Sequence, residues 1–415
     1  MHPRRTNTII IGAGQAGLAM SRELTQRGIE HLVLERGLVG ESWRSRPWES
    51  LRLLTPNWAN GLPGMPYWGP DPHGFMSAAD LIERLDSYAN LVEAPVHEHT
   101  EVLHVSRGES GFVLATSQGP YRARNLVLAS GACTEAAIPP LAAALPRRIR
   151  QFSAGTYTRA ADLPKGGVLV VGASASGVQI ASEIQTSGRQ VVLATSSHLR
   201  LPRSYRGRDI EWWLDAIGAL DESIETVDDV DRVRRTPSPQ LSGKPDPVDL
   251  AALQARGVEI AGRLCQVRDG EALFSGGLGH LVASADLKLA RLCRRIDAWA
   301  ADHLAGTSLP PAETPAPTPL PHTPRLSLDL NAGEISTVVW ATGYRPDFSW
   351  LGLPVFDARQ RLRHQGGVVT PVPGLYVLGL PFLRRRRSAL LSGVGGDANA
   401  LARHLERRLR QSAAA

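Results

Sequence analysis

The chain has 415 residues, of which 43% are hydrophobic and 21% are charged, and its formal net charge is +6. These values are ordinary for a globular protein and allow two or three domains with a large buried core. The arginines are scattered and no nucleic-acid-binding pattern accompanies them, so we expect no nucleic-acid partner. No apolar run reaches the ~18–20 residues of a membrane span, and the first expected strand leaves no room for a signal peptide. We therefore expect a cytoplasmic protein without a membrane partner.

The first predicted unit is a strand at 8–11, a glycine-rich turn, a helix at about 15–26 and a second strand at 31–35. The turn reads Gly12-Ala13-Gly14-Gln15-Ala16-Gly17. Backbone N–H groups at such a helix N-terminus bind the pyrophosphate of a dinucleotide. Glu35 lies 18 residues after Gly17, where a carboxylate accepts hydrogen bonds from the adenosine ribose. This arrangement predicts FAD or NAD; the alternative for Glu35 is a solvated charge beside Arg36.

The next predicted elements are less regular. Residues 40–75 are rich in Trp, Pro and Gly and are expected to form an ordered loop region. A helix over about 77–90 begins at a plausible cap, Ser77, and residues 96–130 alternate as short strands do.

A second strand–turn–helix–strand unit is predicted over 167–194, with the turn Gly172-Ala173-Ser174-Ala175-Ser176-Gly177. Ser174 and Ser176 replace glycines and have hydroxyls to donate to a pyrophosphate. The position 18 residues after Gly177 is Thr195, and the basic residues that follow are Arg200, Arg203, Arg206 and Arg208. A missing carboxylate followed by arginines suits the 2′-phosphate of NADP. We therefore predict NADPH here, bound by Arg200 and Arg203; the alternative is a basic surface loop.

The remaining pattern sets the expected domain organisation. Residues 205–235 look helical and polar, 305–325 are a proline-rich connector, apolar strands return at 336–343 and 375–379, and an amphipathic helix spans about 397–410. We predict an α/β fold of two dinucleotide-binding Rossmann-like domains, the second inserted into the first. The FAD-binding domain is expected at 1–160 and 330–415, and the NADPH-binding domain at 161–329. Two bound dinucleotides imply electron transfer between them.

At this point the residues resemble the single-component flavin-containing monooxygenases, in their bacterial branch, over nearly the whole length. The resemblance rests on Gly12-x-Gly14-x-x-Gly17 with Glu35, Gly40-Glu41-Ser42-Trp43, Trp48-Glu49-Ser50-Leu51-Arg52-Leu53-Leu54-Thr55-Pro56, Gly172-x-Ser174-x-Ser176-Gly177, Ala341-Thr342-Gly343-Tyr344, and the tail at 388–398.

The resemblance implies FAD in the first domain, with Trp43 and the loop at 51–56 near the isoalloxazine ring. It implies that NADPH reduces the flavin and that oxygen then forms a C4a-hydroperoxide, which oxygenates a small organic substrate at nitrogen, sulfur or a carbonyl. The residues expected to bind the two cofactors are Gly12, Gly14, Gln15, Ala16, Gly17, Glu35, Arg36, Trp43, Arg52, Thr55, Val102, Gly172, Ser174, Ser176, Gly177, Arg200, Arg203 and Asp397. The expected partners are the substrate and molecular oxygen, with a homodimer as an open alternative.

Two departures from the family pattern keep other functions open. Relatives often carry Asn or His directly before Thr-Pro in the flavin loop, but here Leu54 stands there, and Asn57 is the candidate catalytic substitute. Phe152 stands where relatives often show His. The alternatives are an NADPH-dependent flavin oxidase or reductase that yields hydrogen peroxide, and a redox-sensing flavoprotein. No metal-ligand spacing and no Cys-x-x-Cys pair occurs, so we expect neither a metal nor a redox disulfide.

Two features near the C-terminus have competing interpretations. The arginine run at 384–387 is either a solvated face or a contact to a cofactor phosphate or an anionic substrate. Asp397 lies near the start of the last helix, whose N-terminus is expected to face the flavin C2 carbonyl. The alternative for Asp397 is a simple helix cap.

Overall fold

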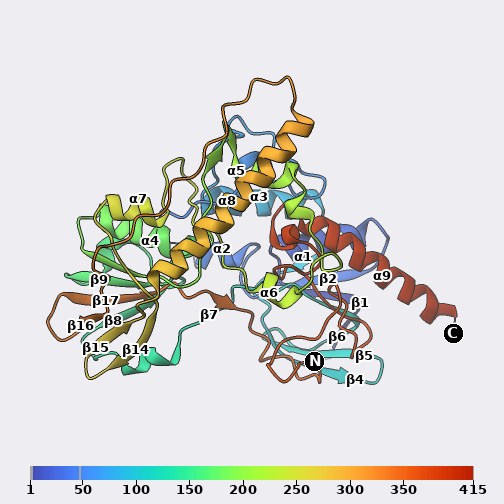
Figure 1. Ribbon diagram of the computed structural model, residues 1–415. Coiled ribbons are helices and arrows are strands. Elements are labelled where there is room, and N and C mark those ends of the chain that lie inside the picture. The colour runs from blue at the N-terminus through green and yellow to red at the C-terminus, as the bar shows by residue number, and fades with distance from the viewer. Residues whose placement is uncertain (1–2, 46–47, 415) are drawn as a thin grey trace.

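The computed structural model describes residues 3–45 and 48–414, which form two sheet regions on opposite sides of the molecule in Figure 1. The first sheet has the order β3-β2-β1-β6-β5-β4, and a further strand, β19, pairs with β6. Its strands are β1 (Arg4–Ile11), β2 (His31–Leu34), β3 (Val96–His97), β4 (Val102–Gly108), β5 (Gly111–Thr116), β6 (Tyr121–Leu128) and β19 (Leu375–Val377). The pairs that involve β1, β2, β3, β6 and β19 are parallel, except that β5 joins β6 antiparallel.

Helices of the first region are α1 (Gln15–Thr25), α2 (Glu41–Ser45), α3 (Ala78–Leu91) and α9 (Val394–Ala414). Helix α1 contacts α9, so the last helix of the chain closes the region that the first strand opens. The predicted cap of α3 is confirmed, because the Ser77 hydroxyl accepts a hydrogen bond from Asp80 N and the Asp80 carboxylate accepts one from Ser77 N.

The second sheet is entirely parallel, with the order β13-β10-β9-β17-β8. Its strands are β8 (Arg150–Ser153), β9 (Gly167–Val171), β10 (Val191–Ala194), β13 (Glu259–Ala261) and β17 (Ile335–Trp340). Every residue of β9 and β10 is buried, as expected of parallel strands that are covered on both faces.

Alternate residues of β9 point to two different cores. Val168 and Val170 belong to the core that includes residues of α4 (Ala175–Thr186) and α7 (Leu250–Ala255). Leu169 and Val171 belong to the core that includes a small antiparallel sheet of β14 (Leu264–Arg268), β15 (Glu271–Phe274) and β16 (Ser327–Asp329).

The predicted domain boundaries at residues 161 and 329 are wrong. The strand expected to resume the first sheet is β17, and it lies between β9 and β8 in the second sheet instead. The second region therefore runs from β8 to β17, and the chain returns to the first sheet only with β19. The physical reason is that a fully buried apolar strand fits the middle of either sheet, and its sequence does not identify its neighbours. The chain passes between the two regions twice, before β8 and after β17. At these two places β7 (Glu135–Ala136) and β18 (Tyr344–Arg345) form a short antiparallel pair.

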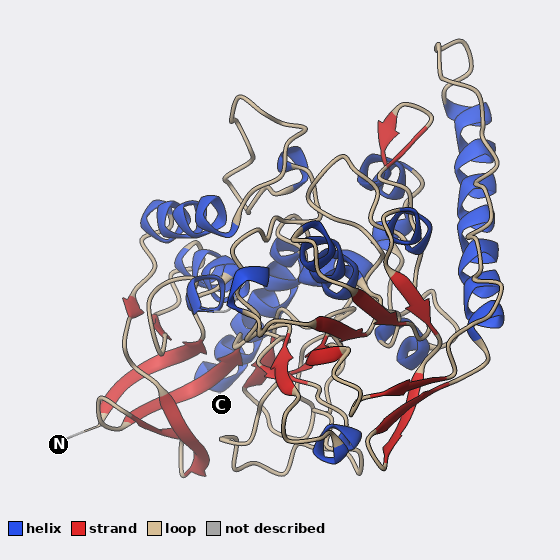
Figure 2. Cartoon of the chain, turned by 90° about the vertical axis from the view of Figure 1, so that its left-hand side faces the viewer, coloured by secondary structure: helices blue, strands red, loops and turns tan. Residues whose placement is uncertain are grey.

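A helical layer accompanies the second sheet, and most of it was not predicted. It contains the hairpin β11 (Ser204–Tyr205) and β12 (Arg208–Asp209), then α5 (Ile210–Ala216) and the long α8 (Leu278–His303). Helix α6 (Val230–Arg234) lies instead beside the first region, where Asp231 pairs with Arg361. Helix α8 rises to the top of Figure 1 and stands along one edge in Figure 2. The expectation of a polar helical stretch at 205–235 is only partly met, because Trp213 of α5 is fully buried against Ile296 and other apolar residues. The connector at 305–325 has no regular secondary structure, as predicted. Among the described helices none is both long and apolar enough to cross a membrane.

Candidate functional site

The three glycines of the first turn have two different surroundings. Gly12 has φ of +106°, and a Cβ there would lie 2.5 Å from Ala129 O. A Cβ on Gly17 would lie 1.8 Å from Gly12 O. Gly14, in contrast, has nothing within 4 Å of its Cβ position. Gly12 and Gly17 are therefore required for close packing within the protein, while Gly14 faces open space that a ligand can approach.

The second turn repeats this geometry. Gly172 has φ of +107° and its Cβ would lie 2.3 Å from Ala341 O, while a Cβ on Gly177 would lie 1.8 Å from Gly172 O. Ser174 takes the place of Gly14, with φ of −87° against −83° for Gly14. Ser174 precedes α4, but its hydroxyl does not cap that helix. The Ser174 hydroxyl is thus left for another hydrogen-bond partner at the helix N-terminus.

Glu35 is held at the end of β2 by the turn itself. Its Oε2 accepts a hydrogen bond from Ala13 N at 2.8 Å and its Oε1 accepts one from Gly37 N at 3.1 Å. The residue is buried, so it is not the solvated charge of the alternative interpretation, whereas Arg36 is exposed. The half-buried Val102 begins β4. The segment before it reaches Glu35 through the hydrogen bond from Thr100 N to Glu35 O. Gln15 and Ala16 form the first turn of α1.

The equivalent end of β10 differs sharply. Thr195 is fully buried, and its hydroxyl has no hydrogen-bond partner among the described residues. Arg200 donates to Asp249 and to Asp286, each at 2.8 Å. Arg206 donates to Asp297 at 3.1 Å, and Arg208 lies over the Trp212 ring at 4.0 Å. Arg200, Arg206 and Arg208 thus each have a partner in the helical layer.

Arg203 connects the second region to the loop at 51–56. Its Nη1 donates to Leu54 O and its Nη2 donates to Asp209, both at 2.7 Å. Its guanidinium also lies over the Phe75 ring, 5.0 Å from the centroid. Binding of a 2′-phosphate by Arg200 or Arg203 would have to compete with these carboxylates. Sequence reasoning missed these contacts because the acidic partners of Arg200, Asp249 and Asp286, lie far along the chain.

The loop at 51–56 is held by several other contacts. Leu53 N donates to Met76 O at 2.8 Å, and Arg52 Nη1 donates to Phe75 O at 2.8 Å. Thr55 Oγ1 donates to Asn60 Oδ1 at 2.5 Å. Gly243 lies so close that a Cβ on it would be 2.4 Å from Arg52 Cβ. Residues of both regions therefore fix this loop, and the half-buried Trp43 lies in α2 against the first core.

Leu54 and Asn57 differ in what surrounds them. The Leu54 side chain packs against the apolar core of the helical layer. Asn57 is buried, and its Nδ2 donates to Asp71 O at 2.8 Å, but its Oδ1 has no partner among the described residues. Asn57 thus retains one unsatisfied acceptor, while the leucine offers only apolar surface.

The N-terminus of α9 carries Asp397 inside its first turn, rather than as a residue that precedes the helix. Burial raises the pKa of Asp397, and a hydrogen bond from Ser388 and the charge of Arg384 oppose that rise. Gly396 has nothing within 4 Å of its Cβ position, so this helix end also borders open space. Asp397 is therefore a buried carboxyl group within the helix and not a simple helix cap.

The arginine run at 384–387 is exposed at Arg385 and Arg386, and members of the run form ion pairs within the chain. Arg386 pairs with Glu222 at 2.7 Å, and Arg387 pairs with Asp221 at 2.9 Å and also with Asp215. Arg384 donates to Gly366 O at 2.9 Å. The run therefore links the chain after β19 to the helical layer of the second region. Within residues 3–45 and 48–414, no group of three or more His, Cys, Asp or Glu side chains could hold a metal ion.

Comparisons with known proteins agree with this architecture. The sequence profile of the family described as pyridine nucleotide-disulphide oxidoreductase matches residues 9–218. The chain is 32% identical to an uncharacterized CzcO-like oxidoreductase of Geobacillus kaustophilus (strain HTA426), over 95% of this chain and 97% of that protein. It is 27% identical to indole-3-pyruvate monooxygenase YUCCA4 of Oryza sativa subsp. japonica, over 48% of this chain and 49% of that protein.

Among solved structures, the fold is similar to a flavin-containing monooxygenase from Stenotrophomonas maltophilia. The TM-score is 0.68 at 18% sequence identity, over 98% of this chain and 99% of that chain. The residues that match the family profile include both glycine turns, and the chain has three cysteines and no Cys-x-x-Cys pair. On its sequence and its fold, the chain belongs to the pyridine nucleotide-disulphide oxidoreductase family.

Proposed function

We propose that this chain is an NADPH-dependent FAD monooxygenase that oxygenates a small organic substrate at nitrogen, sulfur or a carbonyl. The observation that carries the proposal is the pair of glycine turns, each with two glycines packed against backbone; the third position faces open space at Gly14 and carries a hydroxyl that does not cap the helix at Ser174. One turn accounts for one dinucleotide, so two turns account for a flavin and a nicotinamide cofactor in one chain. The likeness to the Stenotrophomonas and YUCCA proteins, which are named as monooxygenases, supports this choice.

The residues divide between the two cofactors as follows. The turn at 12–17 would hold the FAD pyrophosphate on backbone N–H groups, and Glu35 would accept hydrogen bonds from its ribose. Trp43, Arg52, Thr55 and the open N-terminus of α9 would surround the flavin ring. The turn at 172–177, with the Ser174 and Ser176 hydroxyls, would hold the NADPH pyrophosphate. The lack of an acid at position 195 is what favours NADPH over NADH there.

When bound, FAD would accept a hydride from NADPH and activate oxygen as a C4a-hydroperoxide. The protein's task is then to keep water away from the reacting ring and to hold the loop at 51–56 still. The hydrogen bond from Arg203 to the Leu54 carbonyl and the packing of Leu54 against the helical layer hold this loop in place. In a productive turnover NADPH, oxygen, a proton and the substrate yield NADP⁺, the oxygenated product and water.

Leu54 favours a second candidate function, an NADPH oxidase that releases hydrogen peroxide. A leucine side chain cannot donate a hydrogen bond to an oxygen adduct, and the buried Asn57 amide already donates to Asp71 O. In that reaction NADPH, oxygen and a proton yield NADP⁺ and hydrogen peroxide.

The yield of hydrogen peroxide per NADPH separates the two candidates. The purified FAD-loaded enzyme is first reduced with NADPH without oxygen and then mixed with oxygen in a stopped-flow spectrometer. A monooxygenase shows a spectral intermediate that lasts for seconds and a peroxide yield that falls when substrate is added. Direct reoxidation without an intermediate, with one peroxide per NADPH at every substrate concentration, establishes the oxidase instead.

A further inference from the structure

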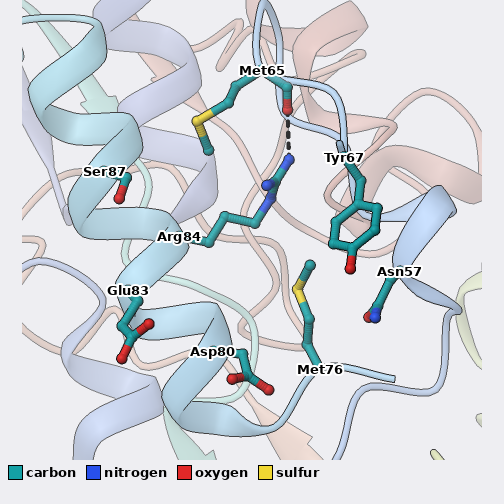
Figure 3. Close-up of a pocket in the computed structure, with 8 residues that line it drawn as sticks. All are labelled: Asn57, Met65, Tyr67, Met76, Asp80, Glu83, Arg84 and Ser87. Atoms are coloured by element: carbon teal, nitrogen blue, oxygen red, sulfur yellow. Dashed lines mark hydrogen bonds between the residues drawn. The ribbon is translucent and has the colours of Figure 1, made fainter. Parts of the chain in front are cut away.

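A cavity of about 460 Å³ opens between helix α3 and the segment at 57–76 (Figure 3). Its volume lies in the range of sites for small organic molecules. The cavity adjoins the loop at 51–56, because Asn57 follows that loop directly and the Met76 carbonyl accepts a hydrogen bond from Leu53 N. None of the contacts described above for the two glycine turns uses the groups that line it.

One wall carries a positive charge that no carboxylate of the described residues pairs with. Arg84 Nε donates to Asn60 O at 3.1 Å, and its Nη2 donates to Met65 O at 2.6 Å, the bond drawn in Figure 3. The guanidinium also lies 5.9 Å from the centroid of the Tyr67 ring. Two carbonyls and a ring thus hold the group in place without neutralising it, and its Nη1 makes no hydrogen bond within the described chain. An anionic ligand group would complete its set of partners.

The rim carries two carboxylates from α3, three positions apart and hence on one side of the helix. Asp80 uses Oδ2 to accept from Ser77, which leaves its Oδ1 available. Glu83 is exposed at the rim and forms neither a hydrogen bond nor an ion pair with the described residues. The rim is therefore negatively charged beside the positively charged wall.

The floor combines apolar surface with one unsatisfied acceptor. Met76 and Asn57 are 6% and 7% exposed, and Met65 beside them is half-buried. The Asn57 Oδ1 has no donor, although its Nδ2 is bonded to Asp71 O. Leaving a buried acceptor unpaired is costly, so a ligand N–H that reaches it would be favoured. The flexible methionine side chains suit an unbranched alkyl or thioether group.

We propose that this cavity binds a small zwitterion of the α-amino-acid type with an unbranched apolar side chain. Its carboxylate pairs with Arg84, and its ammonium group faces the Asp80 and Glu83 carboxylates of α3, on the side of the cavity opposite Asn57 in Figure 3. The ligand's alkyl or thioether chain contacts Met65 and Met76.

Three ligands that share one alkyl chain test this assignment by calorimetry on the FAD-loaded enzyme. L-norleucine carries both charged groups, pentylamine lacks the carboxylate and hexanoate lacks the ammonium group. We expect norleucine to bind at least ten-fold more tightly than either, because a charge-assisted hydrogen bond contributes about that factor. Equal binding of pentylamine, equal binding of hexanoate, or no binding of norleucine at millimolar concentration would each overturn the proposal.

One variant and a matched control test where the ammonium group binds. Glu83→Gln removes an exposed charge that holds no other part of the protein, so its fold should be intact. We expect norleucine to bind about three- to five-fold more weakly and hexanoate to bind as before. Glu109→Gln, at the exposed β4–β5 turn, is the control and should change neither ligand. An unchanged norleucine affinity in Glu83→Gln would refute the proposed orientation.

That the bound zwitterion is also the substrate rests on the proposed function. L-methionine, which has the same shape and a soft sulfur, should then stimulate NADPH consumption in the wild type and less so in Glu83→Gln. The two claims fail separately. Absent binding with normal flavin reduction defeats the cavity proposal alone, whereas normal binding with a flavin that NADPH cannot reduce defeats the proposed function alone.

Discussion

The two nucleotide-binding regions have nearly the same turn but different surroundings after the second strand. Gly12 and Gly172 have φ values of +106° and +107°, and the Cβ positions of Gly17 and Gly177 each meet a carbonyl at 1.8 Å. Past the second strand, however, Glu35 accepts two backbone hydrogen bonds, whereas Thr195 has a buried hydroxyl without a partner. Both turns thus need glycine at the same two positions for the same steric reason. The residue that would contact the ribose, however, differs between the two regions.

The helical layer adds a second difference. It follows β10, whereas α2 and α3 follow β2, and the charges of Arg200, Arg203 and Arg206 are paired with Asp286, Asp209 and Asp297 of the layer. Arg200 thus links α8 to the start of α7, whereas Arg203 and Arg206 form their ion pairs within the layer. In Arg203 the same network reaches the loop at 51–56 of the first region.

The largest effect is expected from the shared glycine positions. Gly17→Ala and Gly177→Ala should each destabilise the protein by about 3 kcal/mol or more, because the added carbon meets backbone that cannot shift cheaply. Gly14→Ala, which enters open space, should leave the fold intact and weaken FAD binding. Urea unfolding and flavin content measure the two effects. A Gly17→Ala protein as stable as the wild type would show that the turn is looser than described.

A pH effect on stability is expected from Glu211 in the helical layer. Burial, with the nearby Asp209 charge, raises the pKa of Glu211 to about 7, while Arg203 opposes the rise. Since the unfolded carboxyl ionises at a lower pH, the folded state binds more protons between about pH 4.5 and 7 and loses stability as pH rises through that window. Glu211→Gln should therefore stabilise the protein at pH 8 by up to about 3 kcal/mol and have little effect at pH 4.5. Equal stabilisation at both pH values would exclude ionisation as the cause.

The next effect tests whether Arg200 is structural. Arg200→Ala leaves Asp249 and Asp286 without their mostly buried partner, so the free energy of unfolding should fall by about 2 kcal/mol. The ratio of kcat/KM for NADPH to that for NADH should stay within about two-fold of the wild type. A loss of NADPH preference without a loss of stability would instead return Arg200 to the 2′-phosphate site.

The smallest effect is expected from a substitution that makes the end of β10 resemble the end of β2. Thr195→Glu places a carboxylate where Glu35 stands in the first region, within reach of the turn as Glu35 is. It should lower the ratio of kcat/KM for NADPH to that for NADH by about ten-fold, because a carboxylate repels the 2′-phosphate. Thr195→Gln controls for side-chain size. If both variants behave alike, charge at this position does not select the coenzyme.

The sequence predicted local features better than contacts between residues that are far apart in the chain. Both glycine turns, the Ser77 cap and the proline-rich connector depend on residues that are adjacent in the chain, and they were found where expected. The sheet to which β17 belongs, the partners of Arg200 and the ion pairs of the run at 384–387 depend on residues far away in the chain. Helix α8 was missed because no motif marked it, although its buried residues recur at helical spacing.

In the proposed function one chain binds two dinucleotides, and electrons pass from NADPH to FAD. Anaerobic mixing of the FAD-loaded enzyme with NADPH tests it most directly. We expect the flavin's visible absorbance to disappear at a rate that saturates with NADPH concentration. When Ser174→Val blocks the second turn, the NADPH concentration that gives half of the maximal rate should rise. A protein that binds FAD but whose absorbance NADPH leaves unchanged would contradict the account.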